Sequence, residues 1–367
     1  MTTMLDFYRQ HQISPVKQAI GDLPAHFQRR AGLYRALGLP PVAINGHSVL
    51  EVGPGSGENA LYTLSLGPNV SYQLIEPNHA AAERLRSMLP AHLVEIDESR
   101  LQDITPFPYW DVVICEGLLG LSGGDPQALL GKLTGFVKPA GILVITTIDP
   151  ISDCAEVIRR ALAHRLLNRS ASLVEQVETL KPAFTSHLNT LKGMTRSVED
   201  WIVDNLLNPA SIGPTFSIPE ACQALDGQFE VLGSSPRFLT DWRWYKDTVP
   251  GTLWAQQAYW EQAHNLMDYR VITQARPDWD NRHLMRVCVR VREVIREFEQ
   301  QPADASTEPV MQALMDLTGL PRLTMCAIRQ AIQLLNTPPS AEAISEAKEL
   351  APWFGRGQQY LSFVRVN

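Results

Sequence analysis

The sequence has few cysteines, and none of them lies in a metal-binding or redox motif. The five residues are odd in number and widely spaced, and no C-x-x-C or H-x-x-x-H pattern occurs: Cys115, Cys154, Cys222, Cys288 and Cys326. Neither a disulfide framework nor a zinc site is indicated. We expect reduced thiols packed among apolar residues, as in a cytoplasmic protein.

Long apolar runs and an excess of basic charge are also missing. No run approaches the ~18 apolar residues that span a bilayer, and residues 1–6 lack the features of a signal peptide. A net charge of −7 argues against nucleic acid as a partner, because phosphate neutralisation requires a basic face. At 367 residues, 45% of them hydrophobic, the chain is expected to form one globular domain with a sizeable addition.

A glycine-rich loop follows the apolar run Val49–Val52. The segment reads E-x-G-x-G-x-G, from Glu51 through Gly53 and Gly55 to Gly57. In the dinucleotide-binding fingerprint G-x-G-x-x-G the third glycine would fall one place later, at a position that is glutamate here. A carboxylate just before the loop suits a ligand with an ammonium group better than a pyrophosphate.

A second apolar run, Tyr72–Ile75, ends in Glu76. A carboxylate at the end of the strand after a glycine loop can accept hydrogen bonds from both hydroxyls of a ribose. The two segments together indicate a nucleoside-binding site at the edge of an open α/β sheet.

Two further segments follow in order. Asp111–Glu116 reads as a buried strand with polar ends, and Phe136–Ile145 matches an "L-K-P-G-G-x-L" turn and strand in which Ala140 replaces a glycine. With the first two segments, they resemble the class I S-adenosylmethionine-dependent methyltransferases, of the small-molecule type with a helical insertion. The resemblance implies an α/β fold with a seven-stranded Rossmann-like sheet and a helical cap, and S-adenosyl-L-methionine as cofactor.

The resemblance also implies roles for particular residues. Glu51 would face the methionine ammonium, Gly53, Gly55 and Gly57 would form the close-approach loop, and Glu76 would hold the ribose hydroxyls. Asn78 would line the adenine side, where Asp97 and Ser99 compete for contact with the adenine amine. For Glu51 and Glu76 a purely structural role in the loop is the alternative.

Glu116, at the end of the fourth expected strand, is the candidate catalytic residue. Ligands of parallel sheets lie outside the carboxyl ends of the strands, so its side chain is expected to face the cofactor cleft. It could act as a base, bind a substrate amine, or only accept a hydrogen bond from a neighbouring loop. The resembled family has no universal catalytic residue, because the sulfonium already activates the methyl group.

Alternating apolar and helical patterns give the expected organisation. Strands are expected at 48–52, 71–76, 93–96, 111–116, 141–148, 229–234 and, after a long helical block, 357–366. The last would insert antiparallel between the fifth and sixth. The expected parts are a helical segment (1–45), a cofactor-binding core (46–244, with a helical insert at 152–207), a helical insertion (245–350) and the final strand (351–367).

Several interpretations stay open at this point. The leading helix at 4–38 could cover the cofactor site or merely pack on the sheet, and the helical block could form a lid or a pocket wall. The aromatic residues Trp242, Trp244 and Tyr245 could cage a cation, although anchoring the core is favoured. A methyltransferase acting on a small molecule is the favoured function. A non-catalytic cofactor-binding scaffold and an NAD(P)-dependent oxidoreductase are the alternatives, the latter disfavoured by Glu58.

Overall fold

The computed structural model describes residues 4–13, 21–67, 69–120, 124–239 and 241–366. The chain divides into two compact units. Unit 1 consists of Met1–Ile148, Gly213–Tyr259 and Gln358–Asn367, and unit 2 consists of Asp149–Ile212 and Trp260–Gly357. Each unit is therefore assembled from segments that are distant in the sequence.

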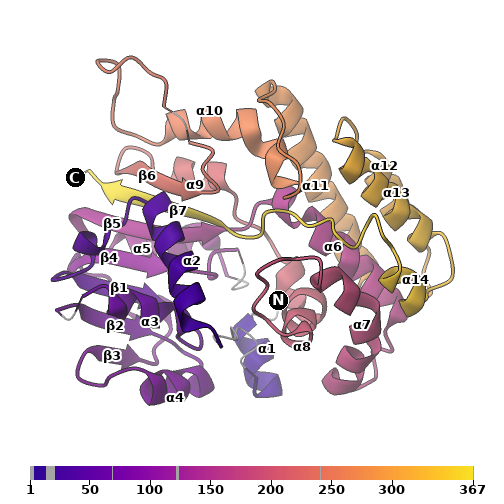
Figure 1. Ribbon diagram of the computed structural model, residues 1–367, viewed down its shortest axis with the longest axis horizontal. Helices are drawn as coiled ribbons and strands as arrows, with labels where there is room; N and C mark the ends of the chain where they lie inside the picture. The colour runs from indigo at the N-terminus through magenta and orange to yellow at the C-terminus, as the bar shows by residue number, and fades with distance from the viewer. Residues whose placement is uncertain (1–3, 14–20, 68, 121–123, 240, 367) are drawn as a thin grey trace. The chain divides into compact units, whose positions relative to one another are not determined.

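Within the described residues, unit 1 contains a seven-stranded mixed sheet of order β3-β2-β1-β4-β5-β7-β6 (Figure 1). The neighbouring strands from β3 through β2, β1 and β4 to β5 all pair in parallel. Their bounds are β1 (Ser48–Val52), β2 (Ser71–Ile75), β3 (Val94–Asp97), β4 (Trp110–Cys115), β5 (Val137–Thr147), β6 (Phe229–Ser235) and β7 (Gln359–Arg365). The α/β fold class expected from the sequence is confirmed.

The C-terminal strand β7 lies inside this sheet, not at its edge. It runs antiparallel to both neighbours, with Ser362 opposite Val144 of β5 and Phe363 opposite Val231 of β6. The side chains of Leu361 and Phe363 are fully buried. The prediction that the tail inserts between the fifth and sixth strands is confirmed.

The turn within β5 contains the alanine that stands where the family motif has glycine. Ala140 adopts a positive φ of 61°, a conformation that costs an L-residue roughly 1 kcal/mol. The motif's glycine is thus explained by backbone geometry, and this chain tolerates alanine there at the exposed end of the turn.

The helices of unit 1 begin at residues that satisfy their free N–H groups. The side chain of Asn78 caps α4 by accepting a hydrogen bond from Ala80 N, and Asp125 caps α5 through Gln127 N. The bounds are α1 (Met4–His11), α2 (Leu23–Ala36), α3 (Glu58–Ser65), α4 (His79–Met88), α5 (Pro126–Thr134) and α9 (Ile218–Leu225). Helix α10 (Leu253–Gln262) starts in unit 1 and ends just past its boundary.

Unit 2 is helical throughout its described secondary structure. The helical insert expected at 152–207 begins with two helices, because a turn at Asn168–Ala171 and the capping box of Ser172 separate them. The bounds are α6 (Pro150–Leu166), α7 (Leu173–Leu188), α8 (Val198–Trp201), the π-helix η3 (Ile202–Leu207), η4 (Pro209–Ile212), η5 (Ala263–Leu266), α11 (Asp278–Phe298), α12 (Glu308–Met315), α13 (Arg322–Leu335) and α14 (Ala341–Ser345).

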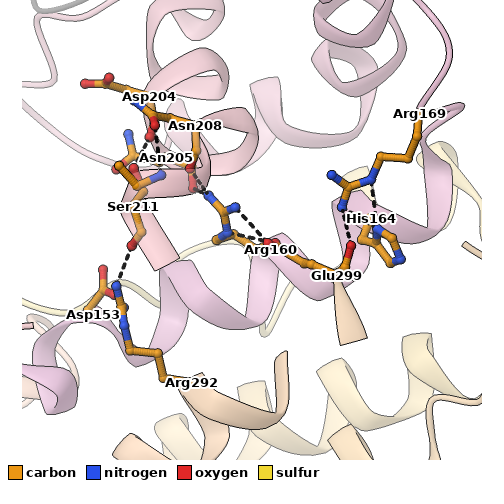
Figure 2. A network of polar contacts seen from close by, with 11 residues as sticks. Asp153, Arg160, His164, Arg169, Asp204, Asn205, Asn208, Ser211, Arg292 and Glu299 are labelled. Carbon is orange, nitrogen blue, oxygen red and sulfur yellow. Dashed lines mark hydrogen bonds and ion pairs between the residues drawn. The ribbon is translucent and has the colours of Figure 1, made fainter. Parts of the chain in front are cut away.

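Buried arginines of α6 and α11 donate hydrogen bonds to carboxylate and backbone carbonyl oxygens within unit 2. Arg160 donates to both carboxylate oxygens of Glu299 at 2.8 Å, and to the carbonyl oxygens of Asn205 and Asn208 at 2.8 and 3.0 Å (Figure 2). Asn205 lies in the last turn of η3 and Asn208 directly follows it, where Asn208 O also accepts a hydrogen bond from Ser211 N at 3.2 Å. Arg160 therefore joins the end of the π-helix to the end of α11.

A second arginine makes the same kind of link. Arg292 of α11 binds the carboxylate of Asp153 on α6 and the carbonyl oxygen of Ser211 in η4 (Figure 2). Arg169 donates to His164 Nδ1 at 2.6 Å, and burial followed by the charge of Arg169 lowers the pKa of that histidine. The network lies wholly within unit 2.

Candidate active site

The glycine loop joins β1 to α3 through residues with positive φ. Gly53 has a φ of 72° and Gly57, which precedes α3, a φ of 87°. A Cβ atom at Gly57 would lie 2.6 Å from Met88 Cε and collide with the side chain of Leu85, both on α4. At Gly53 it would meet no atom within 4 Å. Gly57 thus permits close helix packing, and the open space at Gly53 is where a ligand can approach the backbone.

Glu76 connects the glycine loop to the end of β2. Its carboxylate accepts hydrogen bonds from the backbone N–H groups of Gly55 at 3.0 Å and Asn78 at 2.9 Å. The residue is 6% exposed, and burial raises the pKa of Glu76 to about 7, although both hydrogen bonds favour the ionised form. The carboxylate is therefore fixed in position beside the loop.

Glu51, the second-last residue of β1, is buried and accepts a hydrogen bond from the hydroxyl of Tyr72 on β2. Burial, with a further contribution from the negative charge of Glu116, raises the pKa of Glu51 to about 7. A ligand ammonium near this group would favour its ionised form, because an opposite charge offsets desolvation. The environment of Glu51 suits the role that the resemblance implies.

The residues expected on the adenine side lie at the ends of β2 and β3. The side-chain oxygen of Asn78 accepts from Ala80 N at 3.1 Å, and its nitrogen donates to Ile13 O at 3.5 Å. Asp97 accepts a hydrogen bond from Ser99 N at 2.8 Å, which makes the two competing candidates part of one turn. The structure therefore gathers the glycine loop, Glu76 and Asn78, with Asp97 at the end of the neighbouring strand β3 and Ser99 two residues after it.

Glu116 follows β4 on the other side of β1. Since Val52 is paired with Cys115, the next residue along β4 lies beside Gly53. The Glu116 carboxylate binds both Nη atoms of Arg30, at 2.6 and 3.0 Å, and accepts from Asn59 Nδ2 at 3.0 Å and the Tyr360 hydroxyl at 3.4 Å. A base role would require displacing some of these donors, whereas a charge or positioning role would not.

Arg30, Asn59 and Tyr360 were missed at the sequence level. Arg30 lies on α2, Asn59 in the first turn of α3 and Tyr360 near the start of β7. None belongs to a motif, and Arg30 is 86 residues from its carboxylate partner. The one available signal was the insertion of the tail strand, whose first residues reach the carboxyl edge of β5 through the pairing of Tyr360 with Thr146.

The N-terminal helices contact the loops that would bind the cofactor. Arg9 of α1 donates to Pro77 O at 2.9 Å, and His26 of α2 lies 3.0 Å from Glu58 O at the start of α3. The single helix expected at 4–38 is two helices in the described residues, since residues 14–20 lie outside them. With the Arg30–Glu116 ion pair, these contacts join α1 and α2 to the residues after β2, the start of α3 and the residue after β4.

The aromatic group after β6 does not anchor a core, so that interpretation is wrong. Trp242, Trp244 and Tyr245 are 89%, 59% and 71% exposed. The chain there is an extended loop without regular secondary structure, and a side-chain ion pair between Asp241 and Arg243 keeps its polar groups at the surface.

A group of potential metal ligands lies on the outside of α4. His79, Glu83 and Glu98 have ligand atoms within 4.8 Å of one another. Arg86 already binds both glutamates, at 2.7 and 2.6 Å. A cation would have to displace this guanidinium, so the group is accounted for as a surface ion-pair network.

Comparison with known proteins shows what part of the chain is similar to a known domain. Residues 18–191, which include β1 to β5 and the glycine loop, match the family model of a methyltransferase domain. The matched region is thus similar to methyltransferase domains, and its cofactor is S-adenosyl-L-methionine. No curated protein matches the sequence.

Solved methyltransferase structures show only distant similarity to this chain. An S-adenosylmethionine-dependent enzyme from Mesorhizobium loti is 18% identical over 30% of this chain and 50% of its own, with a TM-score of 0.27. The N-methyltransferase NodS from Bradyrhizobium japonicum, solved with S-adenosyl-L-homocysteine, is 15% identical over 39% and 74%, with a TM-score of 0.32. A proposed sarcosine dimethylglycine methyltransferase from Galdieria sulphuraria is 10% identical over 93% and 86%, with a TM-score of 0.38.

The first three matched structures are covered over 50%, 57% and 61% of their own length. The activity and substrate of the whole chain are therefore matters for proposal. Among the described helices, none has the length and apolar character that crossing a membrane requires.

Proposed function

We propose that this protein transfers a methyl group from S-adenosyl-L-methionine to a small-molecule acceptor. The observation that carries the proposal is the pair of buried carboxyls, Glu51 and Glu76, on either side of a glycine loop with open space above Gly53. Two carboxyl groups there suit a ligand with an ammonium and a ribose, and a pyrophosphate would be repelled by them.

In this proposal each residue holds one part of the cofactor. Glu51 binds the ammonium group, Glu76 accepts from the ribose hydroxyls, and the backbone at Gly53 allows the ligand to approach closely. Asn78, with Asp97 or Ser99, faces the adenine. When bound, the cofactor supplies a methyl group on a sulfonium that is already a good leaving group. The protein's contribution is then alignment and exclusion of water.

Glu116 is proposed to serve the acceptor side of the site. It lies beside Gly53, next to the open end of the glycine loop, and is the acidic residue at the end of β4. Its four donor contacts favour positioning of the acceptor over proton abstraction. A base role remains the alternative hypothesis for this residue.

The charge and the thiols of the chain support the substrate class and location that we propose. A net charge of −7 disfavours nucleic acid, because polyanions are repelled by an acidic protein. The five cysteines are free thiols, as is usual in the reducing cytoplasm. We therefore propose a cytoplasmic enzyme of small-molecule metabolism.

Calorimetric titration with S-adenosylmethionine, S-adenosylhomocysteine and NAD tests the site. We expect the first two to bind and NAD not to. Glu76→Ala should weaken S-adenosylmethionine binding by about 1.5–3 kcal/mol, because it removes hydrogen bonds to a charged group. Glu95→Ala, an exposed glutamate on the neighbouring β3, is the matched control. Equal affinity of the two variants would disprove the ribose assignment, and tight NAD binding would favour an oxidoreductase.

Turnover is tested separately from binding. Cofactor with a labelled methyl group is incubated with the protein and a low-molecular-weight metabolite extract, with transfer RNA, or with a protein extract. We expect label to appear only in the first mixture. Cofactor binding without transfer to any mixture would instead support the non-catalytic scaffold.

A further inference from the structure

The residues around Glu116 leave two buried polar atoms without a partner. Arg30 is 6% exposed, and its Nε has no hydrogen-bond acceptor among the described residues. Asn59 Oδ1 is likewise buried without a donor. Arg30 already binds the Glu116 carboxylate through its two Nη atoms, and Asn59 binds it through Nδ2. One donor and one acceptor therefore remain free in the same small cluster, and a buried polar group without a partner is costly.

The cluster lies at the acceptor side of the proposed cofactor site. Glu116 is beside Gly53 through the β1–β4 register, and Asn59 is two residues beyond Gly57 at the start of α3. Tyr360 reaches the same carboxylate from β7, and burial raises the pKa of its hydroxyl, which keeps it a neutral donor. The four residues come from four different elements of unit 1 and converge on one point.

The charges of the cluster determine which ligand charge it can accommodate. The Glu116 carboxylate and the Arg30 guanidinium form a bidentate pair with no net charge. A ligand carboxylate would be repelled by the negative charge of Glu116, and a ligand ammonium by the positive charge of Arg30. A neutral ligand that both donates and accepts is therefore favoured. Its N–H or O–H can donate to Asn59 Oδ1, and an oxygen on it can accept from Arg30 Nε.

The cluster offers no free base, and this bears on which atom of the acceptor can take the methyl group. A hydroxyl must lose its proton during methyl transfer, and the Glu116 oxygens are already occupied by three residues. A weakly basic amine, which is unprotonated at neutral pH, presents its lone pair and needs no base before transfer. Its nitrogen forms the new N–C bond while the C–S bond breaks, and the electron pair of that bond stays on sulfur. The resulting ammonium then releases its proton to solvent.

We propose that Arg30, Asn59, Glu116 and Tyr360 form the acceptor subsite, and that it takes a small neutral amine with a neighbouring oxygen. This inference rests on the proposed methyl transfer and names the class of acceptor. Arg30 and Tyr360 act as specificity-determining residues that no sequence motif contains.

The class of product tests the proposal. The protein is incubated with methyl-labelled S-adenosylmethionine and a low-molecular-weight metabolite extract, and labelled products are extracted at acid and at alkaline pH. Label that enters the organic phase only at alkaline pH identifies N-methylated amines and supports the proposal. Label in neutral ethers or esters overturns it and leaves the methyltransferase function standing. No label, with cofactor binding retained, overturns both.

Variants then test the residues with the amine found in that experiment. Asn59→Ala and Tyr360→Phe should each raise the KM for the amine roughly tenfold and leave the Kd for S-adenosylmethionine unchanged. Arg30→Lys keeps the charge but removes Nε, and should raise KM similarly. Tyr109→Phe, a half-exposed tyrosine elsewhere in unit 1, is the control. Unchanged KM values, or parallel losses of cofactor binding, would contradict the assignment.

Discussion

At the scale of single residues, the site depends on two carboxyl groups whose environments disfavour charge. Burial raises the pKa of Glu51 and of Glu76 to about 7. An unfolded chain would ionise both near the ordinary value of 4.5. The folded protein without ligand therefore holds these protons more tightly, and each group reduces stability as pH rises from about 4.5 to about 7.

Binding of the cofactor ammonium should favour the ionised form of Glu51 instead of the protonated one. If an ammonium binds ionised Glu51, affinity increases as pH rises through its pKa, roughly 10- to 20-fold between pH 5.5 and 7 for one group. Above about pH 8 affinity should fall again as the ligand's α-amino group loses its proton. Calorimetry across this range measures the profile. Glu51→Gln should flatten the acid limb, and an unaltered slope in that variant would show that another group binds the ammonium.

The Arg30–Glu116 ion pair is expected to contribute to the stability of the folded protein. Both side chains are nearly buried, with 7% and 10% exposure, so removing one partner leaves the other charge uncompensated. Glu116→Gln alone should destabilise the protein by about 3–5 kcal/mol, and the double variant Arg30→Met with Glu116→Gln by less than the sum of the single ones. Denaturant unfolding of the four proteins measures the coupling. Strict additivity would mean that the two groups do not interact.

This contrast shows which residues a sequence can reveal. Glu51 and Glu76 occupy fixed places relative to a glycine loop, so local spacing was enough to single them out. Arg30 and Asn59 acquire their role only through a carboxylate that the fold brings to them. Trp242 and Trp244 are apolar in type but exposed, because composition does not show which aromatic residues lie on a loop outside the core.

At the scale of secondary-structure elements, the position of β7 could be predicted because the resembled sheet has one antiparallel strand between β5 and β6. Its apolar pattern indicated burial, and six earlier strands left the resembled sheet incomplete. A helical block at 245–350 was also expected from the sequence. Its assembly with α6 and α7 into one unit was not, since that depends on buried contacts such as Arg160 with Glu299.

Removing β7 should therefore be far more damaging than its terminal position suggests. Deletion of residues 358–367 opens a gap between β5 and β6 and removes two ladders of backbone hydrogen bonds. It also exposes the surfaces that bury Leu361 and Phe363, at about 1.5–3 kcal/mol for each side chain. We expect the truncated protein to be absent from the soluble fraction. Deletion of residues 366–367 only, beyond the strand, is the control, and a folded 1–357 protein would refute the interpretation.

At the scale of the whole molecule, the proposed cofactor residues and the arginine network belong to different units. Glu51, Glu76 and Glu116 are in unit 1, whereas Arg160, Asp153 and Glu299 are in unit 2. Each unit has its own buried residues and its own polar contacts. Stability and cofactor affinity should therefore be separable by substitutions in unit 2.

Two glutamates near the end of α11 allow this to be tested with the same chemical change. Glu299 binds Arg160 at 2.8 Å with 10% of its side chain exposed, whereas Glu293 lies 3.9 Å from Arg290 and is 46% exposed. Glu299→Gln leaves a buried guanidinium without its counter-charge and should cost about 3–5 kcal/mol. Glu293→Gln should cost less than about 1 kcal/mol.

Denaturant unfolding and calorimetric titration of both variants measure the two properties independently. The Kd for S-adenosylmethionine should be unchanged under conditions where each variant is folded, because none of the proposed ligand contacts is in unit 2. If Glu299→Gln weakened cofactor binding as strongly as Glu76→Ala, the network of unit 2 would have to be coupled to the cofactor site. Equal stability losses from the two glutamates would instead show that the Arg160 ion pair contributes no more than a surface pair.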